Sequence, residues 1–243
     1  MKKERTEDKQ YTEGIAIRGG FAGKLDNFWY HYKWITIGVA FFVIVALICM
    51  IQMCNKEEND LVVVYAGPTQ LSTSEAQDVS NALEALCPSD FDKSGKISVA
   101  LSAYCVMSEQ QIKDEEKQTD VNGESTYIDR NYYSQQYDTY YNYITTGESS
   151  VLLLDPWLYQ ALAKGDRLVS LSEALGYTPD GAYGEYGIKL VDTELYQKYG
   201  VMKKLPSDTV VCLLKPYVVG KSSKEKYYAR EQEMFEAVVG KED

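Results

Sequence analysis

The feature that most constrains this chain is an apolar segment near its N-terminus, Trp34 to Met53. Its twenty residues, WITIGVAFFVIVALICMIQM, include no ionised side chain. An α-helix rises 1.5 Å per residue, so a segment of this length matches a bilayer core of about 30 Å. A buried core helix would be expected to keep a polar face, and this segment has none. We therefore predict a transmembrane helix over residues 34–54, with the lipid bilayer as its partner.

The charges that flank the apolar segment predict its orientation. Lys24, His31 and Lys33 precede it, whereas acidic residues follow it. Because positively charged flanks stay on the cytoplasmic side, the N-terminus is expected inside the cell and the C-terminal part outside. A cleaved signal peptide is the alternative, but the apolar run exceeds the usual signal core, so an uncleaved anchor is expected at the cell membrane. The expected parts are a largely disordered cytoplasmic tail (1–33), the transmembrane helix (34–54), a linker (55–60) and an extracellular domain (61–243).

The composition of the exterior part excludes several functions. Seven of the 25 Lys and Arg residues and five of the 36 Asp and Glu residues precede Trp34, which leaves a net charge of about −13 outside. Such an acidic surface argues against nucleic acid as a partner. The single histidine, His31, precedes the membrane segment, so histidine-based catalytic triads and zinc sites are excluded from the exterior domain. We expect no cofactor and no enzymatic activity, although a carboxylate-based glycan hydrolase stays open among the exterior acids.

Apolar runs alternate with helical patterns in the exterior part. The segments Leu61–Tyr65, Val151–Leu154 and Val210–Leu214 are continuous apolar runs of the kind found in strands covered on both faces. Helical periodicity follows the first of them, with Ser74 predicted as the helix cap and Gln77 as its partner. Alternating strands and helices predict an α/β fold, specifically a three-layer, mainly parallel sheet with helices on both faces.

Two stretches resemble a known class of proteins. The segments GESSVLLLDPWLYQALAKGDRLVSLSEAL (Gly147–Leu175) and LVVVYAGPTQLSTSEAQDVSNALEAL (Leu61–Leu86) are similar to type-2 periplasmic solute-binding proteins. About 68 residues follow Leu175, so the resemblance implies a single lobe of that fold. The arrangement of tail, anchor and domain also resembles single-pass membrane proteins of Gram-positive anaerobes. The resemblance implies a solute-binding-like accessory or sensor component.

Ligands of such sheets bind at the carboxyl ends of the strands, which directs attention to two loops. The candidate ligand-binding residues in these loops are Thr69, Ser72, Thr73, Asp155, Trp157 and Tyr159. Hydroxyls and helix-start N–H groups suit a carboxylate or phosphate, and the aromatic rings suit a sugar or peptide. Helix caps and turns are the alternative interpretation of these residues. A run of tyrosines from Tyr127 to Tyr143 also suggests sugar stacking, but its helical spacing favours core packing.

A short acidic motif resembles the start of a calcium loop. Asp90, Asp92 and Ser94 alternate as oxygen donors, and Gly95 follows them. Leu101 occupies the twelfth position, where a calcium loop needs a bidentate glutamate. These three residues are therefore weak metal-site candidates, and a turn that enters the next strand is favoured.

Taken together, the sequence predicts a membrane-anchored extracytoplasmic binding or interaction module. Its expected partners are a small solute or a membrane protein complex. A structural subunit of an envelope complex without a small ligand is the alternative, and a cell-wall glycan hydrolase is a more distant one.

Overall fold

The structure is a computed structural model that describes residues 21–54, 59–118, 127–216 and 223–240. The chain forms two compact units, Met1–Glu58 and Asn59–Asp243. Most of the predicted tail lies outside the described residues.

The first unit contains one long helix, α1 (Phe21–Cys54). Its segment Phe28–Ile51 is long and apolar enough to cross a membrane, and none of it is buried inside the structure. Large apolar side chains such as Phe42 stay 71% exposed. A contiguous apolar surface of this kind is typical of a site of contact with a membrane or with another protein. The predicted apolar helix is thus confirmed, with properties that a membrane anchor and a signal sequence share.

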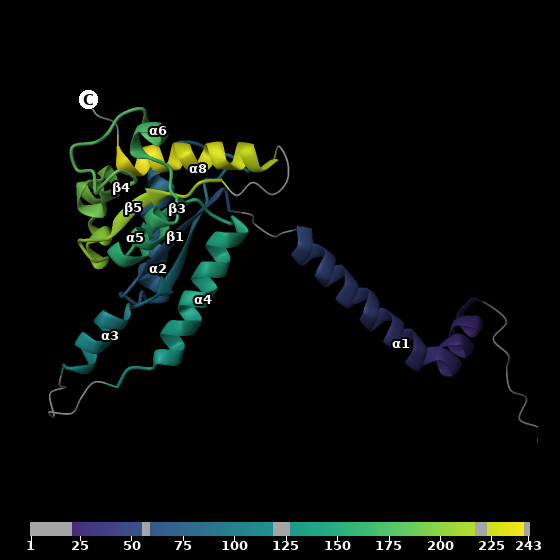
Figure 1. Ribbon diagram of the computed structural model, residues 1–243. Coiled ribbons are helices and arrows are strands. Elements are labelled where there is room, and N and C mark those ends of the chain that lie inside the picture. Colours follow the sequence, from purple (N-terminus) through teal and green to yellow (C-terminus); the bar gives the residue numbers. More distant parts are fainter. Residues whose placement is uncertain (1–20, 55–58, 119–126, 217–222, 241–243) are drawn as a thin grey trace, which may run out of the picture. The chain divides into compact units, whose positions relative to one another are not determined.

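The second unit is an α/β domain, shown in Figure 1. Its strands are β1 (Leu61–Gly67), β2 (Val99–Cys105), β3 (Val151–Leu154), β4 (Gly187–Lys189) and β5 (Val210–Leu213). Its α-helices are α2 (Thr73–Leu86), α3 (Glu109–Glu116), α4 (Arg130–Thr146), α5 (Pro156–Lys164), α6 (Leu171–Leu175), α7 (Glu194–Lys198) and α8 (Ser223–Val239). Two 3₁₀ helices, η1 (Leu190–Asp192) and η2 (Gly200–Lys204), flank α7.

The five strands form one mixed sheet in the order β2-β1-β3-β5-β4. Strand β1 pairs in parallel with β2 and β3, whereas β5 runs antiparallel to both β3 and β4. The predicted α/β class is confirmed, but the sheet is less parallel than the sequence suggests. The reason is that a short, fully apolar strand such as VVCL in β5 suits either direction, since both of its faces are buried.

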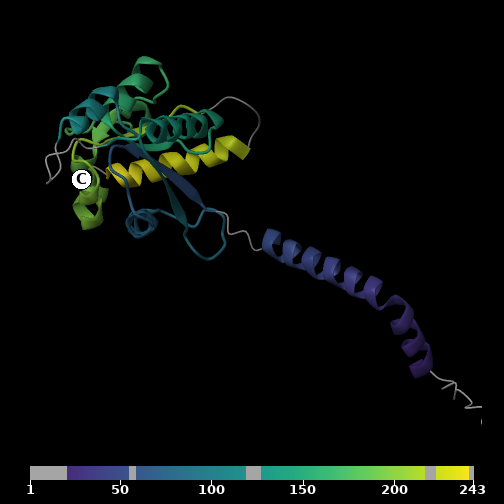
Figure 2. The same ribbon diagram turned by 90° about the horizontal axis from the view of Figure 1, so that it is seen from below.

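Side chains on the two faces of the sheet belong to two separate hydrophobic clusters. From β1, Val63 and Tyr65 enter the first cluster, and Val64 and Ala66 enter the second. Helices α2 and α8 contribute to the first cluster, and α4 and α5 contribute to the second. Figure 2 gives a second view of α8, coloured yellow, whose inward residues Met234, Phe235 and Val238 are completely buried. Burial of apolar side chains in the two clusters supplies most of the domain's driving force for folding.

Helix ends follow the local sequence closely, with one correction. Helix α2 is capped by Ser72, whose side chain accepts from Glu75 N while the Glu75 carboxylate accepts from Ser72 N. The sequence predicts Ser74 and Gln77 in these roles. Both pairs have capping-box spacing. The upstream pair forms the cap because its second member, Glu75, is a carboxylate, and a negative charge is stabilised at the N-terminal end of the helix dipole. Helix α4 ends at Gly147, which has a left-handed φ of 72°.

Candidate functional site

A cleft of about 390 Å³ opens between α3, α4 and the start of α5. It lies where β2 leads into α3 and where β3 leads into α5, that is, at the carboxyl ends of two strands that run in the same direction. Aromatic side chains of Tyr133, Tyr137 and Trp157 line it, together with Ser134 and Arg130. Its position agrees with the general location of ligand sites in open α/β sheets.

One wall of the cleft is an aromatic stack. The ring of Tyr137 lies 5.9 Å from Trp157 at an angle of 22°, and 6.2 Å from Tyr141 at an angle of 19°. Such offset-stacked pairs each stabilise by about 0.5–1.5 kcal/mol beyond the area that they bury. The stack fixes Tyr137 and Trp157 in the cleft wall, while Tyr141, at 48% exposure, extends the stack to the surface.

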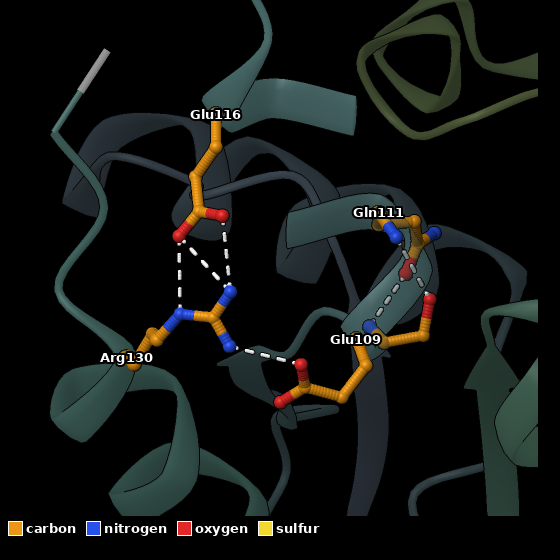
Figure 3. Close-up of polar contacts among 5 residues, drawn as sticks. Glu109, Gln111, Glu116 and Arg130 are labelled. Carbon is orange, nitrogen blue, oxygen red and sulfur yellow. Dashed lines mark hydrogen bonds and ion pairs between the residues drawn. The ribbon is translucent and has the colours of Figure 1, made fainter. Parts of the chain in front are cut away.

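Arg130, the first residue of α4, ties this helix to α3 at the cleft (Figure 3). Its Nε and Nη2 atoms donate to the two carboxylate oxygens of Glu116, both at 3.0 Å. Its Nη1 atom donates to Glu109 Oε2 at 2.9 Å. The bidentate geometry is the strong form of an arginine–carboxylate pair. The guanidinium is therefore engaged by two carboxylates, which leave one negative charge in excess at this place.

Asp155 is a helix cap beside the cleft. Its Oδ1 accepts from Trp157 N at 3.0 Å, and its Oδ2 accepts from Gln111 Nε2 at 2.8 Å. The side chain is buried, and this burial raises the pKa of the carboxyl above its ordinary value. Asp155 thus fixes the start of α5 and positions Trp157 rather than facing open solvent.

Two buried polar atoms near the aromatic stack have no hydrogen-bond partner among the described residues, namely Trp157 Nε1 and Tyr140 Oη. Both side chains contact Tyr137, at ring distances of 5.9 and 6.2 Å. An unsatisfied buried donor costs about 1–3 kcal/mol, so each such atom calls for an explanation. Trp157, a residue that lines the cleft, therefore has a buried donor whose acceptor is not supplied by the described protein.

The other predicted ligand residues are distributed differently. Thr69 donates its backbone N–H to Tyr65 Oη at 3.2 Å, and Ser72 and Thr73 begin α2. None of these three lines the cleft. Tyr159 is 5% exposed and donates its hydroxyl to the Tyr183 carbonyl at 2.7 Å, which makes it a core residue. Of the six predicted residues, only Trp157 lines the cleft, and Asp155 stands two residues before it in the chain.

The acidic motif forms a cluster that includes one residue beyond the motif. Asp60 joins Asp90 and Asp92, with one carboxylate oxygen of each lying within 4.8 Å of the others. Backbone N–H groups donate to all three carboxylates. Asp60 accepts from Asp92 N and Ser98 N, Asp90 accepts from Gly95 N, and Asp92 accepts from Ser94 N. The Ser94 hydroxyl instead donates to the Lys96 carbonyl at 2.9 Å. The arrangement is that of a tight turn stabilised by carboxylates.

Sequence reasoning missed Arg130 and Asp60. Asp60 stands directly before an apolar strand, and a buried carboxylate at a strand start is a recognisable sign of a backbone-capping role. Arg130 carried no local signal, since its partners lie 14 and 21 residues away. No protein-family model, curated protein or solved structure matches this chain.

Proposed function

We propose that this protein is a membrane-anchored binding module whose α/β domain lies outside the cell and takes its ligand in the cleft between α3, α4 and α5. In this proposal α1 is an uncleaved single-pass anchor with the N-terminus in the cytoplasm. The apolar segment Phe28–Ile51 and the cations that precede Trp34 support it. The domain would correspond to one lobe of a type-2 solute-binding protein, which the sequence resembles.

The observation that carries the binding role is the unpaired, buried indole N–H of Trp157, a residue that lines the cleft. A structural subunit would gain from satisfying this donor within its own fold. A binding protein can leave it to a ligand acceptor, since recognition depends on a few polar groups placed in an otherwise apolar wall. The cleft volume of about 390 Å³ lies within the range of about 300–1,000 Å³ that is usual for small-molecule sites.

The test is a melting screen of the detergent-solubilised full chain against sugars, short peptides and divalent cations. We expect at least one compound to raise Tm, because a ligand that binds only the folded state stabilises it. The variant Ser134→Trp places a large side chain in the cleft and should abolish the shift. Ser134 is exposed on α4, so the protein should still fold.

The alternative, a structural subunit without a small ligand, makes a different prediction. Crosslinking of the anchored protein would then capture one membrane protein in stoichiometric amount, and no compound would raise Tm. That pair of results would overturn the binding proposal.

A further inference from the structure

The cleft between α3, α4 and α5 has a composition that selects a class of ligand, and we infer that it binds an uncharged sugar. This inference rests on the proposed binding function and makes it more specific. It depends on three properties of the cleft, namely its charge, its aromatic wall and its unpaired polar groups.

The charges of the cleft disfavour an anion. Among the described residues that line it, Arg130 has the one cationic side chain, and each of its three guanidinium nitrogens donates to Glu109 or Glu116. A carboxylate or phosphate ligand would find only the second N–H groups of Nη1 and Nη2, which lie beside the two glutamate carboxylates. An anionic ligand would also be repelled by the one negative charge that Glu109 and Glu116 leave in excess over Arg130. Arg130, Glu109 and Glu116 together therefore disfavour an acidic ligand.

The aromatic wall suits a sugar ring. Tyr137 and Trp157 lie nearly parallel, with an interplanar angle of 22°, and both line the cleft. The C–H face of a pyranose is apolar and packs on such rings, while its hydroxyls remain free at the edge to form hydrogen bonds. A cation could also lie on an aromatic face, and glucosamine is the cationic probe that tests this alternative.

Unpaired polar groups supply hydrogen bonds of the kind that sugar hydroxyls make. The Trp157 Nε1 donor lacks an acceptor. The Ser134 hydroxyl lines the cleft, and no described side chain or backbone group pairs with it. A hydroxyl can both donate and accept, so one sugar can satisfy an indole N–H and a serine hydroxyl together. Because Nε1 is buried, this contact requires a small shift of the Tyr137–Trp157 stack when the ligand enters.

The experiment uses the intrinsic fluorescence of Trp157. The chain has three tryptophans, so the Trp29→Phe, Trp34→Phe form of the full protein in detergent reports on the cleft alone. The neutral probes are maltotriose and diacetylchitobiose. The charged probes are N-acetylneuraminic acid, glucose 6-phosphate and glucosamine. We expect a saturable change in Trp157 emission with a neutral probe, with an affinity that does not vary with salt concentration.

Matched variants separate stacking from general effects on the fold. Tyr137→Leu should weaken binding of the neutral probe about tenfold, because the cleft wall loses an aromatic side chain that holds Trp157 in place. Tyr127→Leu should leave the affinity unchanged, because Tyr127 is 89% exposed and does not line the cleft. Circular dichroism of both variants checks that they are folded.

Two results would overturn the inference. A saturable response to a charged probe with none to the neutral sugars would reject the sugar class and leave the binding function in place. An unchanged Trp157 emission with every probe would also reject it. The binding function itself fails only if the melting screen is flat as well.

Discussion

The Gln111 side chain links α3 to the start of α5 by donating from Nε2 to Asp155 Oδ2 over 2.8 Å. Its Oε1 atom accepts from Ser108 N at 2.7 Å and so closes the capping box of α3. One amide therefore joins the segments that follow β2 and β3, and it holds the edge of the cleft in place.

Gln111→Ala should lower the free energy of unfolding by about 1–3 kcal/mol, because Ser108 N loses its acceptor and the buried Asp155 carboxylate loses a donor. Chemical denaturation measures the change. Gln110→Ala is the matched control, since Gln110 donates to the exposed Asp114, and it should cost less than about 0.5 kcal/mol. Equal losses in the two variants would contradict the role of Gln111.

Gly67→Ala should destabilise the domain through a clash with Tyr65. A Cβ atom at position 67 would lie 2.7 Å from Tyr65 Oη, and Tyr65 is completely buried. The expected loss is about 1–3 kcal/mol, as for other overpacked sites. In a Tyr65→Phe background the same substitution should cost less, because the clashing oxygen is gone. A double-mutant cycle measures this coupling, and additive losses would show that the clash is not the cause.

Glu231 on α8 should make stability depend on pH. It is 3% exposed and accepts from Ser150 N, and burial raises its pKa from 4.5 to about 7. Because the folded state binds the Glu231 proton more tightly than the unfolded state does, protonation of Glu231 stabilises the folded protein. This stabilisation is complete below about pH 4.5 and is lost as the pH rises through 7. The loss is on the order of 3 kcal/mol.

Glu231→Gln should flatten the stability profile across this window, because glutamine keeps an acceptor for Ser150 N and carries no charge. Urea denaturation between pH 4.5 and 8 measures the effect. Glu233→Gln on the same helix is the control, since Glu233 is exposed, and it should retain the slope of the parent protein. A parent profile that is flat over this range would reject the role of Glu231.

Asp60→Asn should lower the free energy of unfolding by about 1–3 kcal/mol. Asp60 is 1% exposed, and its two oxygens accept from Asp92 N at 2.8 Å and Ser98 N at 3.0 Å. Asparagine offers one oxygen, so one N–H loses its acceptor. Since the backbone already satisfies these oxygens, melting of the parent protein should be the same in calcium and in a chelator. A calcium-dependent rise in Tm that disappears in Asp92→Asn would identify a metal site instead.

Much of the domain could be predicted from local sequence. The apolar runs LVVV and VLLL identified two central strands, because this signal depends on neighbouring residues. Strand direction could not be predicted, since β5 is buried on both faces and its apolar residues suit either direction.

The site was less accessible to sequence reasoning. Trp157 was selected because it follows a buried strand, whereas Arg130 functions through carboxylates far away in the sequence. Tyr159 has the same local setting as Trp157, and only the packing distinguishes them. The Tyr159 ring is buried in the core, whereas Trp157 lines the cleft. Pairings of this kind depend on how the helices pack, and a single sequence does not encode them locally.

Cys212 lies in β5 with no exposed surface, and burial raises the pKa of its thiol. A thiol reagent can reach it only when β5 separates from its neighbours, because the reactive thiolate forms in water and not in the core. The rate of its modification therefore counts the opening events of the central sheet. Modification of Cys212 therefore reports on opening of the folded domain, and a ligand that binds in the cleft should lower the rate of this modification.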